Sequence, residues 1–545
     1  MEDLEPGPAG DEHAASVGVA ALTGTLCAAL ALAVGEFADA LSPRLESFVI
    51  AVGDVFVDLT PGPLVRTSIE TLGMAQKAVL LGGITVGTLA VGALTGILAP
   101  SHRRLSLGVI AALTLFGGWA TSRSPLTSPA WSWAVVAIAA CAAAGALHFA
   151  PGPVRRRAPP PDAPDDPRIR YADRRGFLEW AGGMSVASVA LVGVGRTLLA
   201  DDTVQVARRR IVLPTPATTT TAGTTTTVTT TTTGPESTTT PPTTTEAGFP
   251  PAEDLSPYLT PNPDFYRIDT ALAVPVVDPG DWKLSVTGMV DEPYDLTYDE
   301  ILDMDLVEET VTLACVSNEV GGTLVGNAVW TGVPLAGILE RARPQPAADQ
   351  ILGLSVDGFT AGFPLELATD GRTAMLAVGM NGEPLPLAHG FPARLVVAGL
   401  YGYVSAVKWL SEVVLDSWEG VDGFWIPRGW AKEAPIKISS RIDTPRTRRL
   451  SAGRQPVAGV AWAPLGGIAA VEVSIDAGPW QPCRLGEAAS GETWVQWLHT
   501  WDAQPGEHRI EVRATDRDGL VQPAEPVPPA PNGAEGHHVV RVSVA

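Results

Sequence analysis

The chain has 545 residues and a formal net charge of −22 at pH 7. A chain of this length is expected to form several domains. The negative charge argues against a nucleic-acid-binding protein, because the phosphates of DNA or RNA would be repelled. Cys27, Cys141, Cys315 and Cys483 are the four cysteines, and their spacing shows neither a zinc-type C-x-x-C pair nor a disulfide framework.

The first 200 residues predict a membrane anchor. Crossing a bilayer takes about 20 apolar residues, and five tracts approach or reach that length at 14–34, 79–98, 105–120, 131–150 and 181–200. The segment 42–75 is amphipathic but too interrupted to span, so it is predicted to form an interfacial or re-entrant helix. His148 in one tract and His13 at the edge of another are too few for a relay of haems with paired axial histidines. An anchor is therefore the better interpretation.

Arginines predict the orientation of this anchor. They occur at 103–104 between the second and third tracts, and at 155–157 and 174–175 between the fourth and fifth. The positive-inside rule makes both loops cytoplasmic, so five spans place everything after residue 200 outside the cytoplasm. The run DRRGFLEWAGG at 173–183 resembles a twin-arginine export signal, or is an arginine pair before an ordinary span. Both readings predict a multi-pass protein of the cell membrane with its globular part outside.

Three regions follow the predicted anchor. Residues 201–250 predict a disordered linker, because the Thr/Pro-rich stretch at 214–247 has no apolar period and is typical of an extended stalk. Residues 251–445 mix predicted strands and short helices without regular βα alternation, which favours an α+β domain. Residues 446–545 alternate apolar and polar side chains between turns, which predicts an all-β, immunoglobulin-like sandwich.

Within the predicted α+β domain, a strand at 281–288 and helices at 296–304 and 333–342 are expected from the local patterns. The run TLACVSNEVGG at 312–322 then delivers Cys315 from an apolar strand into a glycine-rich turn. A thiolate at a rigid strand end, with Ser317 and Asn318 beside it to donate hydrogen bonds, suits a soft metal. Taken alone, however, this window favours a buried structural cysteine.

Four runs between residues 263 and 410 carry a family resemblance. They are, in order, PDFYRIDTALAVPVVDPGDWKLSVTG, TLACVSNEVGG, SVDGFTAGFPLELA and MNGEPLPLAHGFPARLVVAGLYGYVSAVKWL. Together they resemble the sulfite oxidase family of molybdopterin enzymes, and HGFPARLVV followed by VKWL is the most specific part. The resemblance implies a sulfite-oxidase-type α+β domain with a molybdenum–molybdopterin cofactor, followed by the family's second domain, which pairs subunits in some relatives.

The resemblance also assigns roles to individual residues. Cys315 matches the metal-ligating cysteine, a natural third soft ligand beside the two sulfurs of the cofactor. Tyr266 and Arg267 match the stretch that passes over the pterin and the metal, and Arg267 is the best candidate for meeting the substrate. Ser355 and Asp357 are pterin-binding candidates or simply turn residues. Residues that match cofactor-holding positions are His389, Arg394, Ser405 and Lys408.

Two departures from the family pattern bear on the substrate. Glu319 and Val320 follow Asn318 where sulfite-oxidising relatives carry a pair of arginines, and Val421 stands where they carry a tyrosine. A carboxylate at that position would repel sulfite or nitrate, so the sulfite activity is not carried over. The cations that remain as candidates for meeting an oxyanion are Arg267, Arg428 and Arg441.

Aromatic residues follow in the segment 422–436, where Phe424, Trp425 and Trp430 surround Arg428. They predict either the rim of a substrate mouth, suited to a bulkier or neutral substrate such as a sulfoxide, or packing under the next domain. The prediction is thus an oxidoreductase that transfers an oxygen atom on a small substrate. It would need an external electron-transfer partner, because no haem, flavin or iron–sulfur motif is present. The alternative is a non-catalytic, stalked surface protein that has lost the cofactor.

Overall fold

The structure is a computed structural model that describes residues 9–42, 45–99, 102–124, 127–150, 174–199, 203–216, 218–219 and 254–545. It divides into two compact units, which are described separately. One comprises Met1–Thr203 with Ala271–Val274, and the other comprises Val204–Thr270 with Pro275–Ala545. Most of the predicted linker and the arginines at 155–157 lie outside the described residues.

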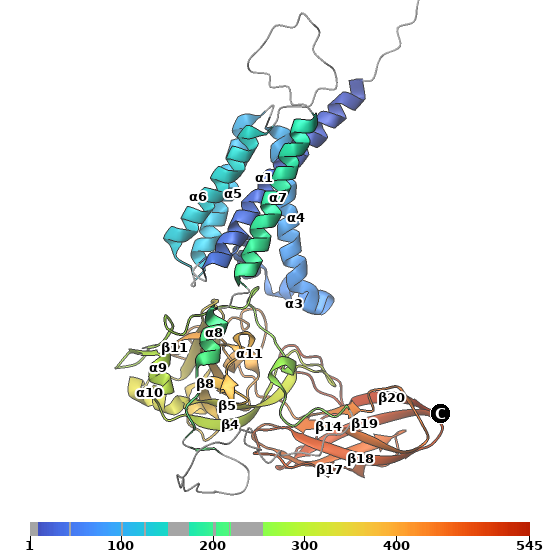
Figure 1. Ribbon diagram of the computed structural model, residues 1–545. Coiled ribbons are helices and arrows are strands. Elements are labelled where there is room, and N and C mark those ends of the chain that lie inside the picture. Colours follow the sequence, from blue (N-terminus) through green and yellow to red (C-terminus); the bar gives the residue numbers. More distant parts are fainter. Residues whose placement is uncertain are drawn as a thin grey trace, which may run out of the picture. The chain divides into compact units, whose positions relative to one another are not determined.

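The first unit is helical (Figure 1). Its long helices are α1 (Ala9–Leu41), α4 (Gln76–Leu98), α5 (Arg103–Arg123), α6 (Pro129–Phe149) and α7 (Arg174–Leu199). Among the described residues, each contains a stretch long and apolar enough to cross a membrane, at Val17–Leu41, Gln76–Leu98, Arg104–Arg123, Pro129–Phe149 and Arg175–Gly195. These stretches correspond to the five predicted tracts, and the third, the shortest in the sequence, is extended to 20 residues.

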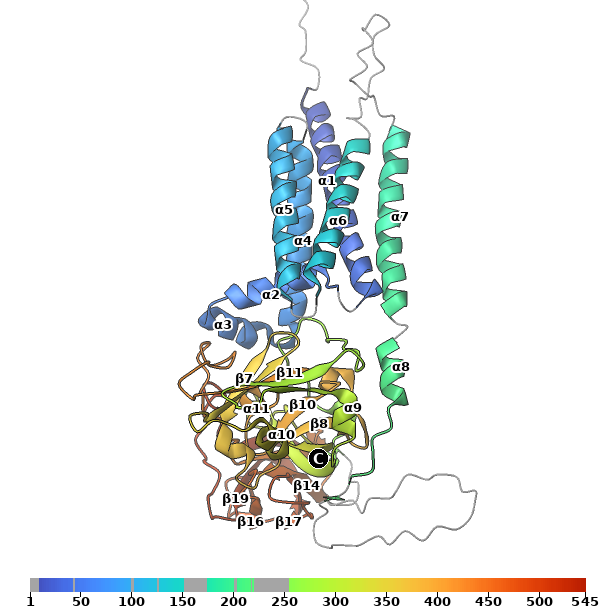
Figure 2. The ribbon, with the colours of Figure 1, turned by 90° about the vertical axis from the view of Figure 1, so that its left-hand side faces the viewer.

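Helix α1 packs against α4, α6 and α7, and α5 packs against α6 (Figure 2). The contact between α1 and α4 depends on small residues: a side-chain carbon on Gly24 would lie 2.0 Å from the carbonyl oxygen of Gly92. Such close helix contacts are typical of apolar helices that associate through van der Waals packing. The predicted amphipathic segment forms α2 (Phe48–Leu59) and α3 (Gly62–Leu72), both too short to span a bilayer.

The part of the second unit before residue 417 contains two mixed sheets. One is six-stranded, in the order β1-β4-β5-β8-β10 with β9 paired to β8. Its strands are β1 (Thr218–Thr219), β4 (Val307–Ala314), β5 (Val325–Pro334), β8 (Ala374–Met380), β9 (Glu383–Pro384) and β10 (Arg394–Val397). The other has the order β3-β2-β11-β6-β7. Its strands are β2 (Lys283–Gly288), β3 (Tyr294–Thr297), β6 (Gln350–Ser355), β7 (Thr360–Pro364) and β11 (Leu410–Asp416).

Short helices connect these strands, in agreement with the α+β prediction. They include α9 (Tyr298–Leu302), α10 (Leu335–Ala342) and α11 (Gly402–Ser405). Helix α9 begins with a capping box, in which the Thr297 hydroxyl accepts from Glu300 N and the Glu300 carboxylate accepts from Thr297 N. One element differs from the sequence prediction. Residues of the predicted disordered linker form helix α8 (Thr203–Arg210), because its Arg208 is buried and donates to Leu385 O and Pro384 O, both at 2.7 Å.

The C-terminal part is rich in β-strands. One sheet has the order β12-β14-β18-β17 and the other the order β13-β20-β19-β15-β16. The strands are β12 (Ser439–Thr444), β13 (Arg449–Leu450), β14 (Gly453–Trp462), β15 (Ile468–Ile475), β16 (Gln481–Pro482), β17 (Arg484–Leu485), β18 (Val495–Ala503), β19 (Gly506–Asp516) and β20 (His538–Val544). Both sheets contribute to one core, with Val457 and Trp497 from the first and Val471, Val473 and Val512 from the second.

Two glycines of this unit should respond in opposite ways to substitution by alanine. Gly332 lies in β5, where a side-chain carbon would sit 2.1 Å from the Leu376 carbonyl oxygen of β8. Gly337 lies in α10, where nothing is within 4 Å. We expect Gly332→Ala to cost about 1–3 kcal/mol through overpacking, whereas Gly337→Ala should gain about 0.5–1 kcal/mol in helix propensity.

The measurement is the thermal unfolding midpoint of the full-length protein in detergent. A Gly332→Ala variant that unfolds at the wild-type temperature would contradict the tight approach of β5 and β8.

Candidate active site

Cys315 occupies a fixed position at the end of β4. Its backbone N donates to Leu324 O at 2.9 Å, directly before β5 begins, and Asn318 N donates to Cys315 O at 3.0 Å. Leu324 N in turn donates to the Asn318 side-chain oxygen at 2.8 Å. Gly321 adopts a φ of +78°, which a residue without a side chain accommodates. The predicted strand and glycine turn are therefore present, and they hold the cysteine rigidly.

The side chain of Cys315 is buried. Burial raises the pKa of the Cys315 thiol, while hydrogen bonds from the backbone and hydroxyl of Ser317 act in the opposite direction. Ser317 thus has the predicted place beside the sulfur, whereas Asn318 contributes its side-chain oxygen to the loop. A thiol held in this way is protonated by itself, and a bound metal would convert it to the thiolate.

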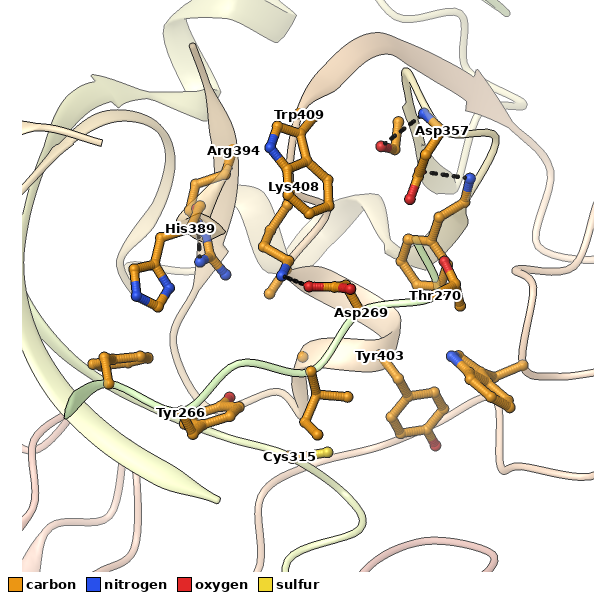
Figure 3. A pocket seen from close by; sticks show the side chains of 17 residues that line it. Tyr266, Asp269, Thr270, Cys315, Asp357, His389, Arg394, Tyr403, Lys408 and Trp409 are labelled. Carbon is orange, nitrogen blue, oxygen red and sulfur yellow. Dashed lines mark hydrogen bonds and ion pairs between the residues drawn. The ribbon is translucent and has the colours of Figure 1, made fainter. Parts of the chain in front are cut away.

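Cys315 lies in the wall of a pocket of about 730 Å³, a volume that includes space open to solvent. Figure 3 shows the sulfur between Tyr266 and Tyr403, with Lys408, Arg394 and His389 further along the same hollow. Of the residues predicted from the sequence, the pocket brings together Tyr266, Cys315, Ser355, Asp357, His389, Arg394 and Lys408.

Three basic side chains meet in this pocket. Gly390, with a φ of +108°, allows the approach, since a side-chain carbon there would lie 3.0 Å from Lys408 Cβ and 3.2 Å from Arg394 Cβ. The Arg394 guanidinium lies 4.8 Å from the ring centre of Trp330 and donates to His389 O at 3.2 Å. His389 Nε2 forms a hydrogen bond with the backbone oxygen of Asn262 at 3.0 Å.

The pKa values of all three groups are lowered, first of all because burial removes the charged forms from water. Burial lowers the pKa of Arg394 to about 10. It lowers the pKa of Lys408 to about 8, against the opposing effect of Asp269. Burial, with Arg394 nearby, lowers the pKa of His389 to about 4, so this imidazole is neutral at pH 7. In the described parts of the chain no carboxylate forms an ion pair with Arg394. A buried charge without a counter-ion lowers the stability of the fold unless an anion binds there.

The terminal phosphate of a molybdopterin is such an anion, and the residues present fit the cofactor. The buried thiol is a suitable ligand for the metal, and the two buried cations are suitable partners for phosphate oxygens. Ser355 and Asp357 add hydrogen-bonding groups from the turn after β6. Asp357 N donates to Ser355 Oγ at 3.4 Å, and burial raises the pKa of the Asp357 carboxyl.

Asp269 is the charged residue of this pocket that sequence reasoning missed, and Phe359 and Tyr403 are aromatic residues of the lining that it also missed. The Asp269 side chain is 4% exposed and accepts from Lys408 Nζ at 2.7 Å and from Arg267 Nε at 2.8 Å. The partner lysine is 139 positions away along the chain. The local indication in the sequence was an acidic residue in the mainly apolar run after Arg267. It did not indicate which cation would form an ion pair with this residue.

Other predicted residues take different places. Arg267 does not line the pocket, because its guanidinium is held by Asp269. Ser405 also lies outside the lining, and its hydroxyl donates to Tyr401 O at 3.1 Å within α11. Arg441 donates to Asp443, Gly322 O and Ser256, so it is engaged in structure. The Arg428 guanidinium lies 3.6 Å from the ring centre of Phe424 and donates to the Phe424 backbone oxygen.

Aromatic rings border the pocket, and of the three aromatic residues predicted for a substrate mouth only Trp425 is among its lining residues. Phe359, Tyr403 and Trp425 line it. They are joined through Phe424 and Trp430, with ring centres 5.8 Å apart for Phe359–Phe424, 5.1 Å for Phe424–Trp425, 6.4 Å for Trp425–Trp430 and 5.8 Å for Tyr403–Trp430. These five rings form the aromatic arc.

The two adjacent histidines near the C-terminus have separate partners. His537 Nδ1 lies 2.9 Å from a Glu511 carboxylate oxygen, and His538 Nδ1 accepts from Ile442 N at 2.9 Å. They therefore face different surroundings, as expected for neighbours on a strand.

Removing the Asp269 carboxylate should destabilise the protein. Asp269→Asn would leave Lys408 buried without its counter-charge, and breaking one half of a buried pair typically costs about 3–5 kcal/mol. The matched control is Asp295→Asn, whose carboxylate pairs with Lys283 at an exposed site, and which should cause no measurable change.

A urea titration of the cofactor-free, full-length protein, followed by tryptophan fluorescence, measures both variants. Equal stability of Asp269→Asn and Asp295→Asn would contradict the assigned role of Asp269.

Comparison with known proteins places these residues in context. Residues 271–425 match the family described as oxidoreductase molybdopterin binding domain. Mitochondrial sulfite oxidase of Homo sapiens is 31% identical over 324 residues, which cover 50% of this chain and 59% of that protein. Sulfite oxidase of Arabidopsis thaliana is 30% identical over 317 residues, covering 49% of this chain and 76% of that protein. The solved structure of the sulfane dehydrogenase SoxCD from Paracoccus pantotrophus aligns with 53% of this chain and 82% of its own, at 23% identity and a TM-score of 0.47.

Proposed function

Because the chain belongs to the sulfite oxidase family of molybdopterin oxidoreductases, we propose that it is a membrane-anchored enzyme that transfers an oxygen atom to or from a small substrate outside the cytoplasm. The observation that carries this proposal is the joint placement of a rigidly held thiol and two buried cations around one pocket. When bound, the molybdenum–molybdopterin cofactor would supply the metal-centred, two-electron chemistry of oxygen-atom transfer.

Residues in and beside the pocket have distinct parts in this proposal. Cys315 provides the protein sulfur that holds the metal. Arg394 and Lys408 meet the phosphate, and His389, neutral through its lowered pKa, offers a hydrogen-bonding nitrogen to the pterin. Arg267 acts indirectly, by fixing Asp269, which in turn orients Lys408. A surface protein that had lost its cofactor would gain nothing from burying these cations, so the pocket favours the enzyme over the stalked-protein alternative.

The aromatic arc supports a neutral substrate with an apolar substituent. Phe359, Tyr403 and Trp425 offer flat apolar surface at the pocket, and Ile268 adds an aliphatic side chain. The loop carboxylate of Glu319 is exposed and adds negative charge close to Cys315 in sequence. Arg441, a candidate from the sequence for binding an oxyanion, instead donates to Asp443 and to the backbone oxygen of Gly322. A sulfoxide fits these properties better than sulfite or nitrate.

The remaining parts of the proposal concern location and partners. Five helices long and apolar enough to span a membrane support anchoring, and the arginines of the intervening loops support a globular part outside the cytoplasm. An external electron-transfer partner is proposed because the sequence carries no haem, flavin or iron–sulfur motif. The C-terminal part, proposed to be immunoglobulin-like, would be the place for pairing of two subunits.

The decisive substitution is Cys315→Ser. A hydroxyl is a harder and more weakly ligating group than a thiolate, so turnover should fall by at least about 100-fold, more than is usual for groups that only support a ligand. The metal-centred absorption should change as well. The matched control is Cys483→Ser, remote in the C-terminal part, which should leave both unchanged. Wild-type turnover and spectrum in Cys315→Ser would refute the proposed role.

Substrate preference tests the aromatic arc. Molybdenum-loaded protein should turn over methionine sulfoxide with an artificial electron donor faster than it oxidises sulfite or reduces nitrate. Trp425→Ala should raise KM for the sulfoxide about tenfold, because one large apolar contact is lost. Trp480→Ala in the C-terminal part is the control and should leave KM unchanged. Fast sulfite oxidation by the wild-type protein would sink the sulfoxide assignment.

A further inference from the structure

The loop that follows Cys315 is held from outside its own domain. Arg441, on β12 of the C-terminal part, donates to the backbone oxygen of Gly322 at 2.9 Å. The same guanidinium pairs with Asp443 at 2.6 Å and donates to Ser256 Oγ at 2.9 Å. The side chains of Arg441 and Asp443 are both below 10% exposed. The Arg441 guanidinium therefore forms buried, charge-assisted hydrogen bonds, one of which holds the cysteine loop.

A second contact reaches the neighbouring residue of the loop. His538, on β20, accepts a hydrogen bond from Ile442 N at its Nδ1, so its proton is on Nε2. Its ring is packed so closely on Gly321 that a side-chain carbon there would lie 2.3 Å from His538 Cδ2. Burial, with Arg441 nearby, lowers the pKa of His538, which keeps the ring neutral against the loop. The positive φ of Gly321 and the absence of a side chain are both needed for this fit.

The strand that precedes Cys315 is held from the C-terminal part as well. Thr312, fully buried on β4, donates through its backbone N to Glu492 O at 3.1 Å. Its hydroxyl accepts from Trp494 N at 2.7 Å and donates to Asn327 Oδ1 of β5 at 2.9 Å. Trp494 is anchored in turn through its indole N–H, which donates to Tyr258 O at 2.8 Å. All partners in this network are satisfied, which makes such buried polar contacts specific and rigid.

We propose that the C-terminal part positions Cys315 so that its sulfur stays in the wall of the pocket. Glu492 and Trp494 hold β4, and Arg441 and His538 hold the loop that follows Cys315. These four are positioning residues, because they act on the cysteine through the backbone around it. A metal ligand must be held to within about half an ångström. Beyond Glu308, strand β4 is paired, among the described strands, with β5 on one edge only, and the contacts from the C-terminal part hold its other edge and the following loop. The inference rests on the proposed role of Cys315 as ligand.

The test measures the cysteine itself, without turnover. Full-length protein is prepared without cofactor and alkylated with iodoacetamide, and the peptides containing Cys315 and Cys483 are quantified over time. Arg441→Met removes the buried anchor, so the loop should open more often and the Cys315 rate should rise about tenfold. The Cys483 rate, which reports the folding of the C-terminal part, should not change.

The matched control is Arg513→Met, which breaks the ion pair with Glu472 in the same C-terminal part but touches neither the loop nor β4. Its Cys315 rate should equal that of the wild type. An unchanged Cys315 rate in Arg441→Met would overturn the inference. A joint rise in the alkylation rates of Cys315 and Cys483 would overturn it too. The Arg441 contact would then stabilise the whole C-terminal part and would not hold the cysteine loop locally.

A second set of variants tests the loop from the opposite side. Gly321→Ala drives a methyl group into the His538 ring, and His538→Ala removes the ring, so each should speed alkylation of Cys315. If both act through one contact, the double variant should be no faster than the faster single variant. Independent, multiplicative effects would contradict a shared contact.

In molybdenum-loaded Arg441→Met, the metal-centred absorption should shift and kcat should fall with KM unchanged. Absence of bound metal in the wild type would refute the proposed function, but it would leave the alkylation result standing, so the two failures are distinguishable.

Discussion

The burial of Arg394 and Lys408 is the constraint on which the pocket depends. Each is less than 10% exposed, and a charge in such a place is stable only with a partner. Lys408 has Asp269, while Arg394 relies on backbone oxygens and the face of Trp330. The close approach of the two side chains requires Gly390 between them. A buried cation without a carboxylate partner and a buried thiol in the same pocket suit an anionic cofactor that carries a metal.

The rest of the pocket follows from this division of charge. Its basic end is suited to a phosphate, and Cys315 stands apart from the cations, with Tyr266 and Tyr403 on either side (Figure 3). In the proposed function, binding of the cofactor would therefore neutralise the basic region, and the aromatic arc would remain for the substrate. This separation explains how a family whose relatives include sulfite oxidases can accommodate a pocket whose mouth carries so much apolar surface.

The contacts of the C-terminal part give it a role beyond the subunit pairing that the resemblance implied. Its strands do not merely follow the pocket domain in sequence. They contribute hydrogen bonds to β4 and to the loop after Cys315, so buried polar contacts join the two parts at both places. Loss of the C-terminal part would therefore weaken the positioning of Cys315, although none of the residues of that part lines the pocket.

Much of this architecture follows from local pattern. The length of the apolar tracts determined the five long helices, and the alternation before Cys315, with the glycines after it, determined the strand and turn that present the thiol. The runs around His389 and Lys408 identified the family. Only the tertiary structure decided that Asp269 pairs with Lys408, that Arg267 and Arg441 are engaged in ion pairs, and that Trp494 and His538 reach the cysteine hairpin. Periodicity and tract length are properties of neighbouring residues, whereas the partner of a buried charge or amide is set by which distant strands pack together, and that information is absent from any single stretch of chain.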